Sequence, residues 1–294
     1  AASRRVSRKS CLRASRLLPP PLNPSKARAC PDKPLQHQPV AAFCFLVRQK
    51  PASLLVNPPS PPAVSSVIAP LSSLPDFDPR TVAVVGVDAH LPAVPLAAQT
   101  PDALRARFAQ PPQWEPEVVL EKKFMNREPA HASVLLAIVL REQPMVLLTE
   151  RTAHLSTHSG QVAFPGGRAD PEDASPADTA LREAQEEVGL DRAFVEVLGT
   201  LPTYVTGSSF IITPVVALVQ PDCVLQPNPY EVADLFEVPL AFLLDPAHHR
   251  RHVFDRDGVH REWFSMPYEQ GGKTHFIWGA TAGMLRNFYR FMQA

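Results

Sequence analysis

The chain has 294 residues, of which 45% are hydrophobic and 20% charged, enough apolar side chains for the core of one or two domains. No apolar run reaches the roughly 18 residues that a membrane-spanning helix needs, and the four cysteines lack C-x-x-C spacing, which argues against a membrane protein and a disulfide framework. The net charge is zero, but residues 1–50 are strongly basic and the remainder is acidic. An acidic body argues against nucleic acid as the main partner, and we expect a protein of the reducing cytoplasm.

Residues 1–75 are predicted to be a disordered, basic extension, because they hold 14 of the 34 prolines and show no helical or strand period. The Arg- and Ser-rich composition of residues 1–50 is also typical of an organellar transit peptide. That alternative stays open beside an unstructured extension with no targeting role. Residues 76–128 are predicted to be a lead-in segment with one helix over 102–109, started by Thr100 and Pro101.

The remaining residues, 129–294, are predicted to form one domain. Residues 141–144 resemble a hairpin turn between two apolar strands. Strands are expected at 132–140, 145–149, 161–164, 194–201, 210–220, 252–255 and 262–266, and helices at 176–188 and 281–292. Strands outnumber helices and alternate irregularly with them, so we predict an α+β fold with a mixed sheet.

The helix expected at 176–188 has clear start and stop signals. Ser175 can cap its first turn, with Pro176 at the first helical position and Asp178 completing an S-x-x-D capping box. Gly189 is a typical residue for the end of a helix. The register of its side chains is therefore well defined.

Three carboxylates share one face of this helix, because Glu183 lies three residues before Glu186 and four before Glu187. Such pairs destabilise a helix by roughly 0.2–0.5 kcal/mol each, and the helix dipole disfavours anions in the last turn. The face is either a solvated one, with Arg182 paired to Glu186, or a cation site. The glycine-containing loop at 165–167 favours the cation, since glycine lets backbone groups approach a phosphate or metal closely. Oxygen ligands suit Mg²⁺ or Mn²⁺.

This stretch resembles the Nudix box, whose pattern is G-x5-E-x7-R-E-U-x-E-E-x-G-U, with U a bulky aliphatic residue. The second half of the pattern is matched in register by Arg182, Glu183, Glu186, Glu187, Gly189 and Leu190. The first half departs from it, because strict counting places Arg168 at the glycine and Ala174 at the first glutamate. Gly167 and Asp173 would fit if one residue were inserted.

The flanking residues resemble a subgroup of the Nudix hydrolases, the coenzyme A pyrophosphatases, over about residues 130–294. The subgroup's upstream pattern is roughly L-L-T-x-R-[SA]-x3-R-x3-G-x3-F-P-G-G, which this chain matches at 147–149, Arg151, Gly160 and 164–167. Thr152 and Ser156 depart from it, and Ser156 removes a potential phosphate contact. Downstream similarity is found at 212–216, 231–232, 238–240, 278–279 and 281–282.

The resemblance implies a Nudix-like α/β/α sandwich and Mg²⁺- or Mn²⁺-dependent hydrolysis of a nucleoside diphosphate linked to another group. For the subgroup, that substrate is coenzyme A or a thioester of it. Glu183 and Glu187 are implied as the principal metal ligands, and Glu186 as a further ligand or the group that orients water. Arg182 would brace the acidic cluster.

Other roles are less constrained. Glu231 is our candidate general base and is equally an exposed acid, while Arg151 is a candidate phosphate contact or a surface residue. Gly166 and Gly167 would line the substrate site. His154 and His158 suit a structural or positioning role better than zinc binding.

Two alternatives to coenzyme A hydrolysis remain. The substrate is another nucleotide, such as ADP-ribose, a dinucleotide or a nucleotide sugar, or the chain is a non-catalytic binding module with a Nudix fold. In each case we expect a small-molecule nucleotide partner and no membrane; the oligomeric state stays open, with a homodimer as one option.

Overall fold

The structure, a computed structural model, describes residues 77–121, 128–153, 160–256 and 259–294. All of them belong to one compact unit, 62–294, and the extension predicted at 1–75 lies outside them. None of the described helices is long and apolar enough to span a membrane.

The described residues form four α-helices and twelve strands. The helices are α1 (Pro101–Ala109), α2 (Pro176–Val188), α3 (Leu240–Leu243) and α4 (Gly279–Gln293). The first six strands are β1 (Val84–Val87), β2 (Ala130–Leu140), β3 (Pro144–Arg151), β4 (Val162–Ala163), β5 (Gly166–Arg168) and β6 (Val195–Thr200). The others are β7 (Tyr204–Val205), β8 (Phe210–Val219), β9 (Val232–Pro239), β10 (Arg250–Arg256), β11 (Val259–Gln270) and β12 (Lys273–Trp278).

The larger sheet has eight strands and is mixed, as the sequence predicted. Its main path is β4-β3-β2-β8-β6, while β9 pairs with β3, β5 with β2 and β7 with β8. Strands β2 and β8 are parallel, and the other pairs are antiparallel. The hairpin predicted at 141–144 is confirmed, since Leu140 pairs with Pro144 across it.

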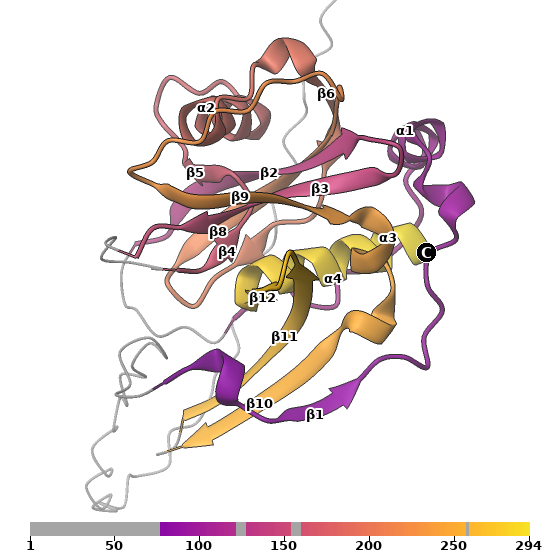
Figure 1. Ribbon diagram of the computed structural model, residues 1–294, viewed down its shortest axis with the longest axis vertical. Coiled ribbons are helices and arrows are strands. Elements are labelled where there is room, and N and C mark those ends of the chain that lie inside the picture. Colours follow the sequence, from indigo (N-terminus) through magenta and orange to yellow (C-terminus); the bar gives the residue numbers. More distant parts are fainter. Residues whose placement is uncertain (1–76, 122–127, 154–159, 257–258) are drawn as a thin grey trace, which may run out of the picture. The chain divides into compact units, whose positions relative to one another are not determined.

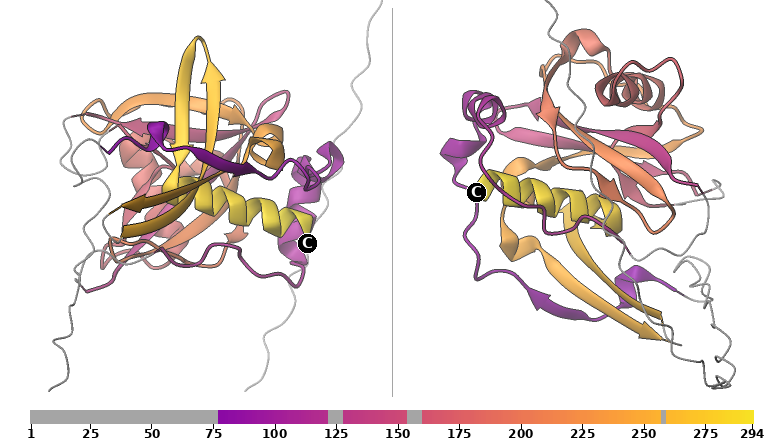
Figure 2. Two further views of the ribbon diagram at one scale, coloured as in Figure 1. Left: turned by 90° about the horizontal axis from the view of Figure 1, so that it is seen from below. Right: turned by 180° about the vertical axis from the view of Figure 1, so that it is seen from behind.

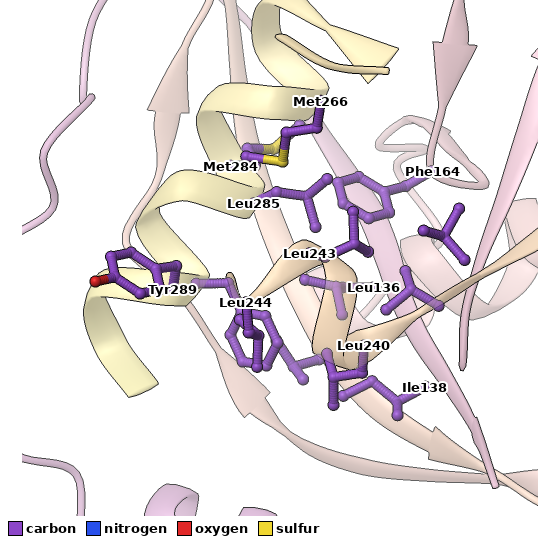
Figure 3. Packing of buried hydrophobic residues seen from close by; sticks show 14 of the residues in the cluster. Leu136, Ile138, Phe164, Leu240, Leu243, Leu244, Met266, Met284, Leu285 and Tyr289 are labelled. Atoms are coloured by element: carbon purple, nitrogen blue, oxygen red, sulfur yellow. The ribbon is translucent and has the colours of Figure 1, made fainter. Parts of the chain in front are cut away.

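Helices cover both faces of this sheet, which is the α/β/α arrangement that the resemblance implied (Figure 1). On β2, Leu135 and Ala137 pack in the cluster that includes the apolar residues of α2. Leu136 and Ile138 belong to a second cluster with residues of α3 and α4 (Figure 3). Because both faces are buried, β2 reads as a continuous apolar run without alternation.

A second sheet, with strand order β1-β10-β11-β12, accompanies the mixed sheet that the sequence predicted. Helix α4 lies between the two sheets (Figures 1 and 2). Its Met284 and Leu285 lie in one cluster with Met266 of β11 and Phe164 (Figure 3). Nearly every residue of α4 after its first turn is therefore buried. The sequence did not predict β1, β5, β7, β9 or β12.

The lead-in segment contributes to the same core as the residues after 128. Helix α1 confirms the helix predicted at 102–109, and its Leu104 is fully buried. Asp88 and Glu117 contact the guanidinium of Arg286 on α4, at 2.9 and 2.7 Å. Arg286 is only 1% exposed, so residues outside the predicted 129–294 domain neutralise a buried charge within it.

Candidate active site

Helix α2 has the bounds and caps that the sequence predicted. Ser175 Oγ accepts a hydrogen bond from the Asp178 backbone N–H at 3.2 Å, and Gly189 adopts the left-handed conformation with φ 68°. The buried Ala180 and Ala184 pack in the cluster shared with the larger sheet. That packing turns the carboxylate of Glu187 toward β5 and the end of β3.

Glu187 is the buried member of the predicted cluster, with a side chain only 6% exposed. Its Oε2 accepts a hydrogen bond from the Gly166 backbone N–H at 3.1 Å, and its Oε1 lies 3.5 Å from Arg151 Nη1. Burial raises the pKa of this carboxyl to about 7. The Gly166 N–H and Arg151 oppose the rise, and Glu231 and Glu183 add to it.

The two glycines of the loop are required for different steric reasons. A Cβ on Gly167 would overlap the carboxylate of Glu183. A Cβ on Gly166 would overlap Ser133 O and Val134 Cα of β2, and its φ of 155° itself favours glycine. Gly167 therefore leaves room for a carboxylate, whereas Gly166 permits close strand pairing and presents its N–H to Glu187.

Arg182 lies among carboxylates on three sides. Its Nη1 contacts Glu183 at 3.0 Å and Glu186 at 3.1 Å, and its Nε and Nη2 donate to the two carboxylate oxygens of Asp173. The Glu186 side chain is 59% exposed, so the solvated i,i+4 pair considered for the sequence is present for that residue. It coexists with the buried Glu187 on the same helix.

Asp173 was placed by the sequence only under the assumption of an insertion. In the structure, hydrogen bonds from Arg182 hold the pKa of its carboxyl well below the usual range. The one-residue departure from the box pattern thus does not separate this acid from the helix. The box pattern would have identified Asp173 directly if one extra residue had been allowed between its glycine and Arg182.

Glu231 lies at the end of the loop before β9, beside the end of β3. Its carbonyl oxygen accepts a hydrogen bond from the Thr152 N–H at 3.0 Å, and the Thr152 hydroxyl donates to Tyr230 O at 3.0 Å. Thr152 is one of the two departures from the subgroup pattern, and here it anchors the Glu231 loop next to Arg151. Glu231 adds to the raised pKa of both Glu183 and Glu187, which places three carboxylates in one electrostatic environment.

The donor set fits a hard divalent cation. Burial raises the pKa of Glu183 despite the adjacent Arg182, and Glu186 and Glu231 raise it further. Carboxylates that repel one another in this way favour the binding of a cation, and oxygen ligands suit Mg²⁺ or Mn²⁺. Glu183 and Glu187 are the members of the predicted ligand set that burial and repulsion affect most.

His154 and His158, together with Ser156, lie outside the described residues. The remaining site residues predicted from the sequence lie on α2, on the loop before and in β5, at the end of β3 and just before β9.

Comparison with known proteins shows similarity to Nudix sequences and structures. A model of the NUDIX domain matches residues 129–264. The protein "Uncharacterized Nudix hydrolase NudL" of Shigella flexneri serotype 5b is 45% identical over 166 residues, which cover 55% of this chain and 84% of the relative. The protein of that name from Escherichia coli K12 matches with the same identity and coverage. Among solved structures, the Nudix hydrolase RenU from M. smegmatis is 28% identical to this chain, with a TM-score of 0.32. The match covers 40% of this chain and 73% of RenU.

Proposed function

Because this chain belongs to the Nudix hydrolase family, it is an enzyme that hydrolyses a phosphoanhydride, and we propose that its substrate is coenzyme A or a thioester of it. The products are then 4′-phosphopantetheine, or its acyl form, and adenosine 3′,5′-bisphosphate. The substrate class rests on the resemblance of residues 130–294 to the coenzyme A pyrophosphatases.

One observation carries the proposal: the buried carboxylate of Glu187 contacts both parts of the combined motif. It belongs to the box helix, accepts a hydrogen bond from Gly166 of the F-P-G-G loop and lies 3.5 Å from Arg151 of the L-L-T-x-R segment. The residues typical of the subgroup therefore lie against the residues typical of the reaction, which is expected if they bind the same diphosphate.

In this proposal Glu183 and Glu187 would hold Mg²⁺ or Mn²⁺, with Glu186 as a further ligand or the group that orients water. The cation, when bound, would neutralise phosphate charge and lower the pKa of the attacking water. Arg151 would bind a phosphate oxygen, because its guanidinium already lies 3.5 Å from the carboxylate of Glu187.

Glu231 is our candidate for the general base. It would accept the proton of the water as the water's oxygen bonds to phosphorus and the bond to the bridging oxygen breaks. Arg182 would position Glu183, through its contact at 3.0 Å. Such a site supplies charge stabilisation and positioning, which are the main requirements of phosphoryl transfer.

A different nucleoside-diphosphate-linked substrate remains the alternative, and Ser156 in place of an arginine favours it. A non-catalytic binding module is disfavoured because Glu183, Glu186 and Glu187 are all retained. Cytoplasmic location and a small nucleotide as the binding partner stay predictions.

The test is mass-spectrometric product analysis of the full chain with coenzyme A, acetyl-coenzyme A and ADP-ribose, each with Mg²⁺ and with Mn²⁺. Glu187→Gln is the matched control. We expect adenosine 3′,5′-bisphosphate from the coenzyme A substrates with the unsubstituted chain alone. Turnover of ADP-ribose with coenzyme A left intact would overturn the proposed substrate.

A further inference from the structure

A second group of charged side chains lies away from α2, where β12 meets β3 and β9. Glu150 of β3 pairs in register with Asp234 of β9. Lys273 Nζ of β12 lies 2.8 Å from Glu150 Oε2 and 2.8 Å from Asp234 Oδ2. Arg151, the residue after Glu150 on β3, contacts Glu187 of α2 instead. The charged group around Glu150 and the carboxylates of α2 therefore lie on different sides of this strand.

His275 supplies an observation that the ion pairs do not explain. Its side chain is 3% exposed and stacks on Phe236 with ring centroids 3.7 Å apart. Its Nδ1 has no hydrogen-bond partner among the described residues, although Glu150 Oε2 lies 3.8 Å away. A buried polar nitrogen without a partner is costly and rare in folded proteins, so this atom requires a ligand or an explanation.

The electrostatic surroundings favour a neutral imidazole. Burial lowers the pKa of His275 and the ammonium of Lys273 lowers it further, while Asp234, Glu150 and Glu269 oppose the shift without reversing it. A neutral imidazole is the form that binds metal ions. One ring nitrogen of His275 and one carboxylate oxygen from each of Glu150 and Asp234 lie within 4.8 Å of one another.

We propose that Glu150, Asp234 and His275 bind a divalent transition-metal ion of the zinc class. Two carboxylates and an imidazole are a common ligand set for such ions, unlike the all-oxygen set on α2. Lys273 is the resident counter-charge at this position, and the metal displaces it. The Lys273 side chain is 47% exposed, so its ammonium can move into solvent and leave an entry path.

Charge balance supports displacement. Two carboxylates and one ammonium leave a net negative charge, whereas two carboxylates and a divalent cation are neutral. The metal also gives His275 Nδ1 the partner that Lys273 does not provide. If the group is only an ion pair between Lys273 and the two acids, His275 takes no part in it, and substituting His275 should not change the binding of metal.

The experiment measures Zn²⁺ bound to the full chain by equilibrium dialysis and elemental analysis. A Glu183→Gln/Glu187→Gln background removes the two principal candidate ligands of α2 from the measurement. Into it we introduce His275→Ala, Asp234→Asn and Lys273→Ala. The matched control is His248→Ala, since His248 stacks on Phe242 with centroids 3.9 Å apart and the same 19° between planes as His275 on Phe236.

We expect one zinc ion per chain to be lost in His275→Ala and in Asp234→Asn, and retained in His248→Ala. Lys273→Ala should bind zinc more tightly, because the competing ammonium is gone. Zinc should also raise the Tm of the background protein but not that of Asp234→Asn, which keeps the test valid if His275→Ala fails to fold. Unchanged zinc content and Tm response in Asp234→Asn, with no tightening in Lys273→Ala, would reduce the group to an ion pair and overturn the proposal.

Discussion

Asp173 and Arg182 form a two-point ion pair, in which Arg182 Nε and Nη2 donate to the two carboxylate oxygens at 3.1 and 3.0 Å. Two parallel hydrogen bonds fix the plane of the guanidinium. The remaining nitrogen, Nη1, is thereby held 3.0 Å from Glu183 and 3.1 Å from Glu186. Asp173 thus orients the arginine that lies against the candidate metal ligands.

Asp173→Asn is expected to lower kcat by about 10–100-fold, the range typical of residues that orient metal ligands. The amide can still accept one hydrogen bond but loses the charge and the second contact. The control is Asp170→Asn, because Asp170 is exposed and 3.8 Å from the same guanidinium. Steady-state kinetics and Mn²⁺ affinity should separate the two variants; equal effects would contradict an orienting role for Asp173.

Alanine at Gly167 and alanine at Gly166 are expected to have different effects, the first on metal binding and the second on stability. In Gly167→Ala the new methyl displaces the flexible end of Glu183, so we expect a folded protein with weakened Mn²⁺ binding and greatly reduced turnover. In Gly166→Ala the methyl meets backbone atoms of β2, and we expect loss of about 3 kcal/mol or more of unfolding free energy. Urea unfolding and Mn²⁺ titration of both variants check this. A folded, fully active Gly167→Ala would show that Glu183 is not needed.

Glu187→Gln should lower turnover by more than a hundredfold, since a ligand is lost and not merely reoriented. The same substitution is expected to raise the stability of the metal-free protein. The folded pKa of Glu187 is about 7 and that of an unfolded glutamate about 4.3, so the folded state binds the proton more tightly. The stability that this proton contributes is complete below pH about 4.3 and is lost as the pH rises to about 7.

At pH 8 without metal, Glu187→Gln is therefore expected to gain up to about 4 kcal/mol of unfolding free energy, and at pH 4 almost nothing. Urea unfolding of the metal-free protein at several pH values measures the difference. Glu186→Gln is the comparison, because that side chain is 59% exposed and should change stability by less than roughly 0.5 kcal/mol. A pH-independent difference for Glu187→Gln would contradict the raised pKa.

The buried charge of Arg286 makes the lead-in segment indispensable. Asp88→Asn removes a carboxylate that lies 2.9 Å from Arg286. The same carboxylate accepts two hydrogen bonds from Arg251. We expect a loss of about 3 kcal/mol, because a buried cation loses a charged partner. Asp102→Asn, at an exposed ion pair with Arg105, should cost less than about 1 kcal/mol. Thermal unfolding of the full chain distinguishes them, and similar Tm values for the two would contradict the argument.

The helix of the candidate site was predictable from local signals. Ser175 and Asp178 act on the first turn of α2 and Gly189 on its last, so their identity and spacing are sufficient to set its bounds. The spacing of Glu183, Glu186 and Glu187 likewise follows from the helical repeat alone. The second sheet was not predictable in this way, because β1 and β10 pair across more than 150 intervening residues, as the contact of Val84 with His252 shows.

Local sequence thus determined which carboxylates share a face, where their helix begins and ends, and that a glycine loop precedes it. Only the tertiary structure decided that Glu187 is buried while Glu186 is exposed. It also decided that Arg151 lies 3.5 Å from Glu187 and that the charge of Glu231 raises the pKa of Glu187. The physical reason is that burial and pKa depend on neighbours supplied by β3, β5 and the loop before β9. Spacing along one helix specifies a direction for each side chain, and packing against those distant segments specifies its environment.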